Sequence, residues 1–252
     1  MCRLLGLIAN KPVDLEFSLE RFKELAREHP DGWGMGWYEE GEAKVFKQAI
    51  SALDPGSKLP QLSKSVTSRI FICHVRRASC GGAREENSHP FKFDNWIFAH
   101  NGTVNRGQLR RKLRGRYAER IAGETDSEVY FRWLLQCIEE EGEVEKGIRV
   151  AVEEARKSTN EALNFLLSDG EHLYAFRYGE SLYKLRREPG ELEEFSYTSS
   201  ETGALLKSKL LRGERAFLVC SERLTEERWE EVEEGSLLRI GGDLGVREVR
   251  VL

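Results

Sequence analysis

The sequence predicts an α+β fold in which helices cover stacked β-sheets. Strand-like segments occupy both ends of the chain, and two helical segments lie between them. No linker-like composition and no internal repeat separates these parts. The 252 residues are 40% hydrophobic, which is enough for a sizeable core. We therefore expect a single domain over residues 1–252.

The first half of the chain is expected to be mostly strands. Ser18 is placed to cap a helix over residues 19–28, and a second short helix is expected within residues 51–68. The dipeptide Glu40-Gly41 favours a hairpin turn. Strands are expected at residues 1–10, 31–38, 42–48, 70–75 and 96–100.

Two helices are expected in the middle of the chain. The segment Thr125-Asp126-Ser127-Glu128 fits a capping box and opens an apolar-periodic helix. A second helix is expected over residues 144–157. The remainder is rich in strands, expected at residues 162–168, 172–178, 181–186, 195–198, 215–219, 236–240 and 246–251.

Composition excludes several classes of function. With 43 acidic and 39 basic residues the formal net charge is -4, which argues against a nucleic-acid partner. The basic run within residues 110–116 is typical of a solvated helix face. No apolar run approaches the roughly 18 residues that span a bilayer. The five cysteines form no CxxC pair, and no signal peptide precedes Cys2, so we expect reduced thiols and a cytoplasmic location.

Cys2 is the most informative residue of the chain. Removal of Met1, which is common before a small residue, would leave a thiol and a free α-amine on one residue. The thiolate is a nucleophile, and an α-amine with a pKa of about 7.7–8.0 can accept the thiol proton. The alternative is an ordinary cysteine at the start of an apolar strand.

Cys2 belongs to a set of four segments that resembles a known family. The segments are Cys2-Arg3-Leu4-Leu5-Gly6, His74-Val75-Arg76-Arg77-Ala78-Ser79, His100-Asn101-Gly102 and Glu124-Thr125-Asp126. Together they resemble the class II glutamine amidotransferases, which are N-terminal nucleophile hydrolases. The opening segment, Asp31-Gly32-Trp33-Gly34 and Asn87-Ser88-His89-Pro90 are most similar to the stand-alone branch of that family. The resemblance covers roughly residues 1–240 and implies a four-layer α/β/β/α sandwich of two antiparallel sheets.

The resemblance implies a nucleophile and an oxyanion hole. Cys2 would attack the amide carbonyl, while the Asn101 side chain and the Gly102 N–H would donate to the developing oxyanion. Glycine suits such a position because its backbone can approach a substrate closely. The alternative for Asn101-Gly102 is a hairpin turn.

The resemblance also implies a clamp for the amino-acid end of the substrate. Arg76 matches the arginine that pairs with the α-carboxylate, which a guanidinium binds bidentately. Asp126 matches the aspartate that holds the α-ammonium, and it would also favour a helix N-terminus. Ser79 and His100 are expected to contact the substrate too. Arg77 and Cys80 depart from the residues common in larger relatives. The resemblance therefore does not predict the details of the pocket wall.

Alternative chemistries are less well supported. His74, His89 and His100 could converge on a metal, but no HxH or HxxxH spacing accompanies them, so no metal and no cofactor is expected. Cys73 and His74 are adjacent in a strand and would face opposite sides, which argues against a Cys/His hydrolase. The glycines at 32, 34 and 36 lack the spacing of a phosphate loop.

The expected activity is hydrolysis of the γ-amide of glutamine or of a γ-glutamyl compound through a Cys2 thioester. The alternative is a non-catalytic binding or regulatory subunit that retains the glutamine pocket. Because the chain ends at Leu252, where larger relatives continue, ammonia would need a separate synthase subunit, or the reaction would be simple hydrolysis. No membrane partner is expected, and association into a homo-oligomer is left open.

Overall fold

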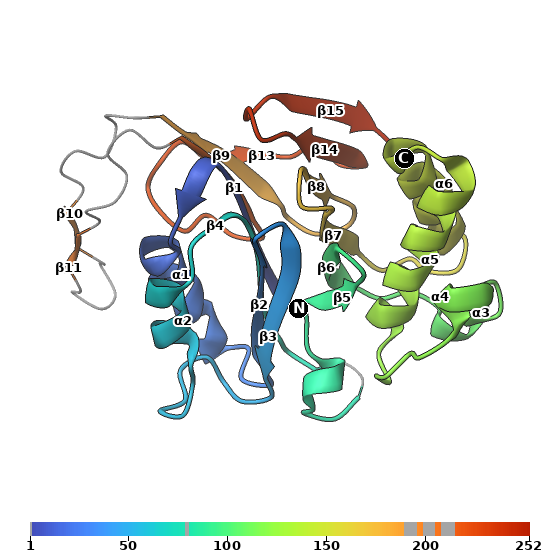
Figure 1. Cartoon of the computed structure of the whole chain (residues 1–252), viewed down its shortest axis with the longest axis horizontal. Helices are drawn as coiled ribbons and strands as arrows, with labels where there is room; N and C mark the ends of the chain where they lie inside the picture. Colours follow the sequence, from blue (N-terminus) through green and yellow to red (C-terminus); the bar gives the residue numbers. More distant parts are fainter. Residues whose placement is uncertain (1, 79–80, 189–195, 199–204, 208–214) are drawn as a thin grey trace.

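The chain folds into two stacked antiparallel sheets with helices on both outer faces. We analysed a computed structural model that describes residues 2–78, 81–188, 196–198, 205–207 and 215–252. Figure 1 shows the four layers, with α1 and α2 against one sheet and α5 and α6 against the other. This arrangement confirms the α+β class and the expected α/β/β/α order.

The first sheet has seven strands in the order β13-β9-β12-β1-β4-β2-β3. Its strands are β1 (Arg3–Val13), β2 (Trp33–Glu39), β3 (Glu42–Gln48), β4 (Ser68–Val75), β9 (Tyr183–Arg187), β12 (Ala216–Cys220) and β13 (Glu230–Glu231). Its outer face carries α1 (Glu16–Glu24), the 3₁₀ turn η1 (Leu25–Arg27) and α2 (Leu59–Ser65). The central strand β1 is therefore paired on both sides.

The second sheet has six strands in the order β15-β14-β8-β7-β6-β5. Its strands are β5 (Phe91–Phe93), β6 (Trp96–Gly102), β7 (Leu163–Ser168), β8 (Leu173–Phe176), β14 (Ser236–Ile240) and β15 (Val246–Arg250). Helices α5 (Asp126–Glu141) and α6 (Val144–Arg156) cover it, and α3 (Arg106–Arg110) and α4 (Gly115–Ala118) contact α5. The 3₁₀ turn η2 (Glu85–Asn87) and the separate pair β10 (Ser196–Thr198) and β11 (Leu205–Lys207) complete the described elements.

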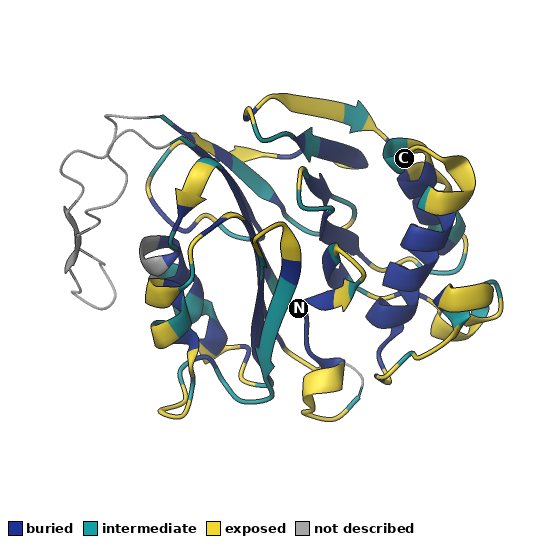
Figure 2. Ribbon diagram, viewed as in Figure 1, coloured by how far each residue is buried: buried dark blue, intermediate teal, exposed yellow. Residues whose placement is uncertain are grey.

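Three hydrophobic cores separate the four layers, and β1 contributes to two of them. Leu5 and Leu7 pack toward α1 and α2, whereas Leu4 and Ile8 pack between the sheets. A strand whose two faces are both buried reads as a continuous apolar run rather than as an alternation. Figure 2 shows this burial along both sheets and the inner faces of the helices.

The start of α5 is fixed from both sides of its first turn. The Thr125 hydroxyl accepts a hydrogen bond from the Glu128 N–H at 3.4 Å, as a helix cap does. The Glu128 carboxylate does not return to Thr125; it accepts from the N–H groups of Ala122 and Gly123 at 3.1 and 2.7 Å. The capping box is thus half formed, and its glutamate orders the loop before the helix. Gly142, with φ of 66°, ends α5 in the left-handed conformation.

Several expectations require correction. Helix α1 begins at Glu16, with no side-chain cap at Leu15. Ser18 lies inside the helix, where its hydroxyl accepts from Arg187 at 3.3 Å, so the expected cap is wrong. The expected strand 96–100 extends through Gly102, and the short elements β5, β11, β13, α3 and α4 were not expected. Of the expected strand 195–198, residue 195 lies outside the described residues. The hairpin turn is confirmed, because Glu40 and Gly41 have φ of 53° and 80°.

Within the described part of the chain, no helix has both the length and the apolar character needed to cross a membrane.

Candidate active site

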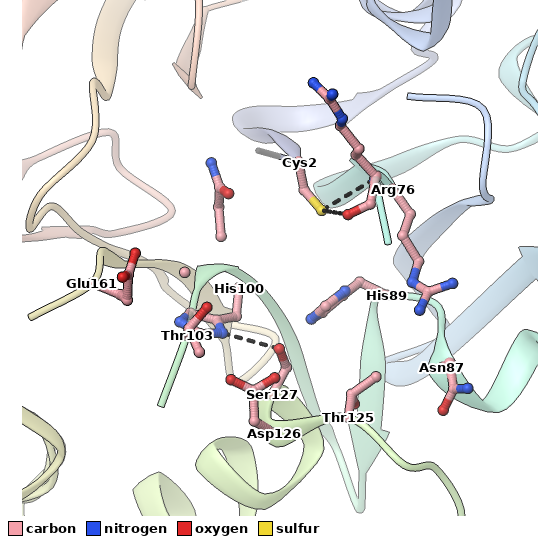
Figure 3. A pocket seen from close by; sticks show the side chains of 13 residues that line it. Cys2, Arg76, Asn87, His89, His100, Thr103, Thr125, Asp126, Ser127 and Glu161 are labelled. Atoms are coloured by element: carbon pink, nitrogen blue, oxygen red, sulfur yellow. Dashed lines mark hydrogen bonds between the residues drawn. The ribbon is translucent and has the colours of Figure 1, made fainter. Parts of the chain in front are cut away.

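The ends of three strands and one helix meet at a pocket of about 220 Å³. Strands β1 and β4 reach it from the first sheet, β6 reaches it from the second sheet, and α5 begins beside it (Figure 3). The lining residues are Cys2, Arg76, Arg77, Asn87, His89, His100, Asn101, Gly102, Thr103, Thr125, Asp126, Ser127 and Glu161. Six of the seven expected site residues are among them. Ser79, like Met1 and Cys80, lies outside the described residues.

Strand pairing places Cys2 against the end of β4. Arg3 pairs with Val75 in the antiparallel ladder. Cys2, which precedes β1, therefore lies opposite the residues that follow β4. The Cys2 Sγ atom is 3.3 Å from the Arg77 carbonyl oxygen and 3.3 Å from the Arg77 backbone nitrogen. The thiol thus donates to one backbone group and accepts from the other, which fixes its direction.

The environment of the Cys2 thiol favours its neutral form. Burial raises the pKa of Cys2, while the hydrogen bond from the Arg77 N–H and the charge of Arg76 act in the opposite direction. Because burial is the larger influence, the thiol is protonated at neutral pH. Any nucleophilic role therefore requires a base that removes this proton.

The end of β6 is shaped by a close backbone approach. A Cβ atom on Gly102 would lie 1.8 Å from the Ala162 carbonyl oxygen, so only glycine fits. The Thr103 N–H donates to that same oxygen at 3.1 Å. Since N–H groups alternate in direction along an antiparallel strand, the Gly102 N–H is directed away from β7. Gly102 lines the pocket together with the buried Asn101.

Arg76 is held beneath the pocket by backbone carbonyls. Its guanidinium donates to the carbonyl oxygens of Gly82 at 3.1 Å and Gly81 at 3.2 Å, and the residue is 3% exposed. Its backbone N–H donates to Gly32 at 2.8 Å. The neighbouring Arg77 is exposed and contributes backbone groups to Cys2. Arg76 is thus buried and Arg77 exposed, although both follow the last residue of β4, Val75.

Asp126 is the first residue of α5 and faces the same pocket. Its Oδ2 atom accepts a hydrogen bond from the Val104 N–H at 2.7 Å. The residue is buried, and its carboxylate also lies at the positive end of the helix dipole. A carboxylate fixed in this way suits a cationic ligand group.

Three histidines converge at the pocket, where His89 and His100 line it and His74 packs against His89, and all three are neutral at physiological pH. The rings of His74 and His89 have centroids 4.2 Å apart, and His100 Nδ1 lies 3.0 Å from the Ser127 hydroxyl. Burial lowers the pKa of His74 to about 3 and that of His100 to about 4, and it also lowers the pKa of His89. Among the described residues, no group of three or more His, Cys, Asp or Glu side chains is arranged to hold a metal ion.

Sequence reasoning did not assign a catalytic or substrate-binding role to several lining residues. They are Asn87, His89, Thr103, Thr125, Ser127 and Glu161. A signal existed for the first two, because Asn87-Ser88-His89-Pro90 contributed to the family resemblance without a function attached to it. Glu161 carried no signal, since it precedes a strand that is distant in sequence from the other lining residues.

The family model for class II glutamine amidotransferases matches residues 1–246. The chain belongs to this family. Among related sequences, the amidotransferase is 36% identical to the protein MJ1515 of Methanocaldococcus jannaschii, over 94% of this chain and 68% of that one. It is 29% identical to a γ-glutamyl-hercynylcysteine sulfoxide hydrolase of Mycolicibacterium smegmatis, over 64% of this chain and 66% of that one.

A solved structure supports the fold of this amidotransferase. A glutamine aminotransferase class-II domain protein from Silicibacter pomeroyi superposes with a TM-score of 0.66 at 23% identity. The match covers 99% of each chain, so it includes both sheets and the covering helices.

Proposed function

We propose that this class II glutamine amidotransferase hydrolyses the γ-amide of glutamine or of a γ-glutamyl compound through a thioester on Cys2. One observation carries the proposal. The Cys2 thiol lies in the same pocket as the Gly102 N–H and the Asn101 amide, and two charged groups, Arg76 and Asp126, line that pocket as well. A thiol, a pair of oxyanion donors and a two-charge clamp are the parts that hydrolysis of an amino-acid amide requires.

The first step forms the carbon–sulfur bond. After loss of Met1, the neutral α-amine of Cys2 takes the thiol proton, and Sγ attacks the γ-carbonyl carbon. The electron pair of the C=O bond moves to oxygen, where the Gly102 N–H and the Asn101 side-chain amide stabilise it. Each such donor typically lowers the barrier by about 2.7–4 kcal/mol.

The second step breaks the carbon–nitrogen bond. The ammonium of Cys2 returns its proton to the leaving nitrogen, which departs as ammonia or an amine and leaves the γ-glutamyl thioester. Water, deprotonated by the same amine, then attacks the thioester carbonyl. The products are glutamate and the regenerated thiol, so one water molecule is consumed for each amide bond cleaved.

The pocket also binds the α-carboxylate and the α-ammonium of the substrate. The buried Arg76 guanidinium supports recognition of the α-carboxylate, and Asp126 supports recognition of the α-ammonium. Both groups are remote from the bond that breaks, so their contribution is the positioning of the carbonyl over Sγ. His100, which lines the pocket, and Ser79 are proposed to contact the substrate as well.

The fate of the leaving group defines two versions of the reaction. Simple hydrolysis of a γ-glutamyl compound is supported by the similarity to the hydrolase of Mycolicibacterium smegmatis. Transfer of ammonia would require a separate synthase subunit that accepts it. Neither version requires a metal or a cofactor.

The decisive experiment combines mass and turnover. Intact-mass measurement of the purified chain should show the loss of Met1. Incubation with glutamine and a panel of γ-glutamyl peptides and amines should release glutamate, and a Cys2→Ala variant with an unchanged circular dichroism spectrum should release none. Retention of Met1 together with binding of glutamine but no turnover would favour the non-catalytic alternative.

A further inference from the structure

We propose that Asn87 is a positioning residue that fixes Arg76 and Asp126 relative to each other. This inference rests on the proposed function, because it concerns how Arg76 and Asp126, the residues proposed to bind the two α-groups, are kept at a fixed distance from each other. Asn87 lies at the edge of the pocket, beside the start of α5 at Thr125 (Figure 3). It is 1% exposed, so its amide must be satisfied by protein groups.

One side of the Asn87 amide holds the loop that carries Arg76. The Asn87 Nδ2 atom donates to the Gly82 carbonyl oxygen at 3.1 Å. The same oxygen accepts from the Arg76 Nη1 atom, also at 3.1 Å. A single carbonyl therefore receives two donors, and a movement of this loop would displace the guanidinium with it.

The other side of the amide holds the loop that leads into α5. The Asn87 Oδ1 atom accepts from the Glu124 N–H at 2.8 Å, and Nδ2 donates to the Glu124 carboxylate at 3.3 Å. Glu124 is two residues before Asp126, and the helix cap at Thr125 lies between them. The amide thus connects the carbonyl that holds one clamp residue to the turn that presents the other.

The surrounding backbone leaves room for this amide and little else. A Cβ atom on Gly81, which has φ of +69°, would lie 2.7 Å from Asn87 Nδ2. A Cβ atom on Gly123 would lie 3.0 Å from Oδ1. Two glycines from the two loops therefore enclose the amide, and their lack of side chains lets both backbones approach it.

The chemistry requires asparagine rather than another residue of similar size. The amide accepts one hydrogen bond and donates two, a combination that neither aspartate nor leucine provides. Aspartate would keep the acceptor for the Glu124 N–H but would lose both donors and place a second carboxylate beside Glu124. Since small misplacements of bound substrate reduce rates strongly, loss of this connection should weaken recognition of both α-groups together.

The test compares substrates that use both clamp residues with substrates that use one. We expect Asn87→Ala and Asn87→Asp to lower kcat/KM for glutamine at least tenfold, mainly through KM. Hydrolysis of 4-aminobutanamide, which lacks the α-carboxylate, and of glutaric acid monoamide, which lacks the α-amine, should fall less than threefold. Asn95→Asp is the matched control, because the Asn95 amide likewise accepts from a backbone N–H, that of Ala43, and donates to a backbone carbonyl, that of Gly41, but lies outside the pocket lining.

A double-mutant cycle provides the second measurement. In an Arg76→Lys, Asp126→Asn background the clamp is already lost, so adding Asn87→Ala should cost less than threefold. Equal losses on all three substrates, or additive losses in the cycle, would overturn the inference and leave Asn87 a general structural residue. A wild-type protein that neither hydrolyses nor binds glutamine or any member of the γ-glutamyl panel would overturn the proposed function itself, whereas an active wild type with unaffected Asn87 variants would overturn only this inference.

Discussion

The Sγ atom of Cys2 lies 3.3 Å from both the backbone nitrogen and the carbonyl oxygen of Arg77. The residue just before the first strand is thereby oriented by the backbone that follows β4, more than seventy residues later. The contact uses no side chain of Arg77, so substitution at that position leaves the thiol in place. Because only the backbone of Arg77 contacts the thiol, the side chains of Arg76 and Arg77 can be tested individually.

Replacement of Cys2 should abolish hydrolysis without unfolding the protein. In Cys2→Ala no other group can form the thioester, so glutamate release should fall to the uncatalysed rate. Thermal unfolding should change little, because Cys2 is only half buried and lies before β1 rather than within it. The measurement is coupled glutamate release beside a melting curve. Turnover close to that of the wild type would rule out the thioester mechanism.

A glutamine-like electrophile should label one cysteine. We expect a diazo-oxo analogue of glutamine to add to Cys2, which lines the pocket. Burial raises the pKa of Cys137 and of Cys220 to about 12 and also raises that of Cys73, so these thiols are neutral and shielded. Peptide mapping by mass spectrometry locates the adduct. An adduct on Cys73 or Cys80 would move the active site.

The two arginines should differ sharply in their sensitivity to substitution. Arg76→Lys keeps the charge but loses the planar fork, so kcat/KM should fall at least tenfold, equivalent to about 1.4 kcal/mol. Asp126→Asn should have a similar effect, because it removes the partner of the α-ammonium. Arg77→Lys is the matched control and should matter much less. If the two lysine substitutions are equally damaging, the assignment of the carboxylate ligand is wrong.

Gly102→Ala should damage both stability and activity. The new methyl group would meet the Ala162 carbonyl oxygen at 1.8 Å, so β6 or β7 must shift, at a cost of about 1–3 kcal/mol. The shift would also move the proposed oxyanion donor. Gly107→Ala is the control, since its nearest neighbour would be 3.7 Å away. Urea unfolding and glutamate release measure the two effects, and an unchanged unfolding midpoint in Gly102→Ala would contradict this packing.

The histidine cluster should make the protein less stable in mild acid. His74 and His100 have pKa values of about 3 and about 4, below the roughly 6.5 of an unfolded chain. As the pH falls below about 6.5 the unfolded state takes up protons first, so the free energy of unfolding decreases by up to about 1.4 kcal/mol per pH unit for each histidine. Urea titrations at pH 7.5, 6.5 and 5.5 should show this slope, and His74→Gln should reduce it. A flat profile would contradict the prediction.

The sequence predicts correctly those features that depend on residues close together in the chain, such as a helix cap or a hairpin turn. Thr125 caps α5, and the positive φ of Glu40 and Gly41 closes the hairpin, as the sequence indicates. Ser18 is different, because its hydroxyl bonds to Arg187, which lies 169 residues away in the chain. A rule for helix caps considers only neighbouring residues, so it cannot predict this hydrogen bond to Arg187. Helix α1 accordingly begins at Glu16, earlier than the rule predicts.

The same distinction applies to the pocket. Cys2, Arg76, Asn101 and Asp126 could be named because their segments match a family pattern, and the structure brings them to one cavity. Asn87 could not be assigned a role, since its contacts join two loops that only tertiary folding brings together. A motif identifies such a residue, but its bonding partners become visible only in the fold.

The position of β1 between β4 and β12 has a consequence for biosynthesis. Its partner β12 ends at Cys220, so the central strand cannot be completed until nearly the whole chain has been made. At about 5–20 residues per second, translation reaches that point roughly ten to forty seconds after it begins. During this interval β1 lacks its ladder with β12, so the removal of Met1 that the proposed mechanism requires would act on a chain whose first strand is not yet fully paired. On the proposed mechanism, the order of synthesis would therefore leave time for that removal before β1 is paired on both sides.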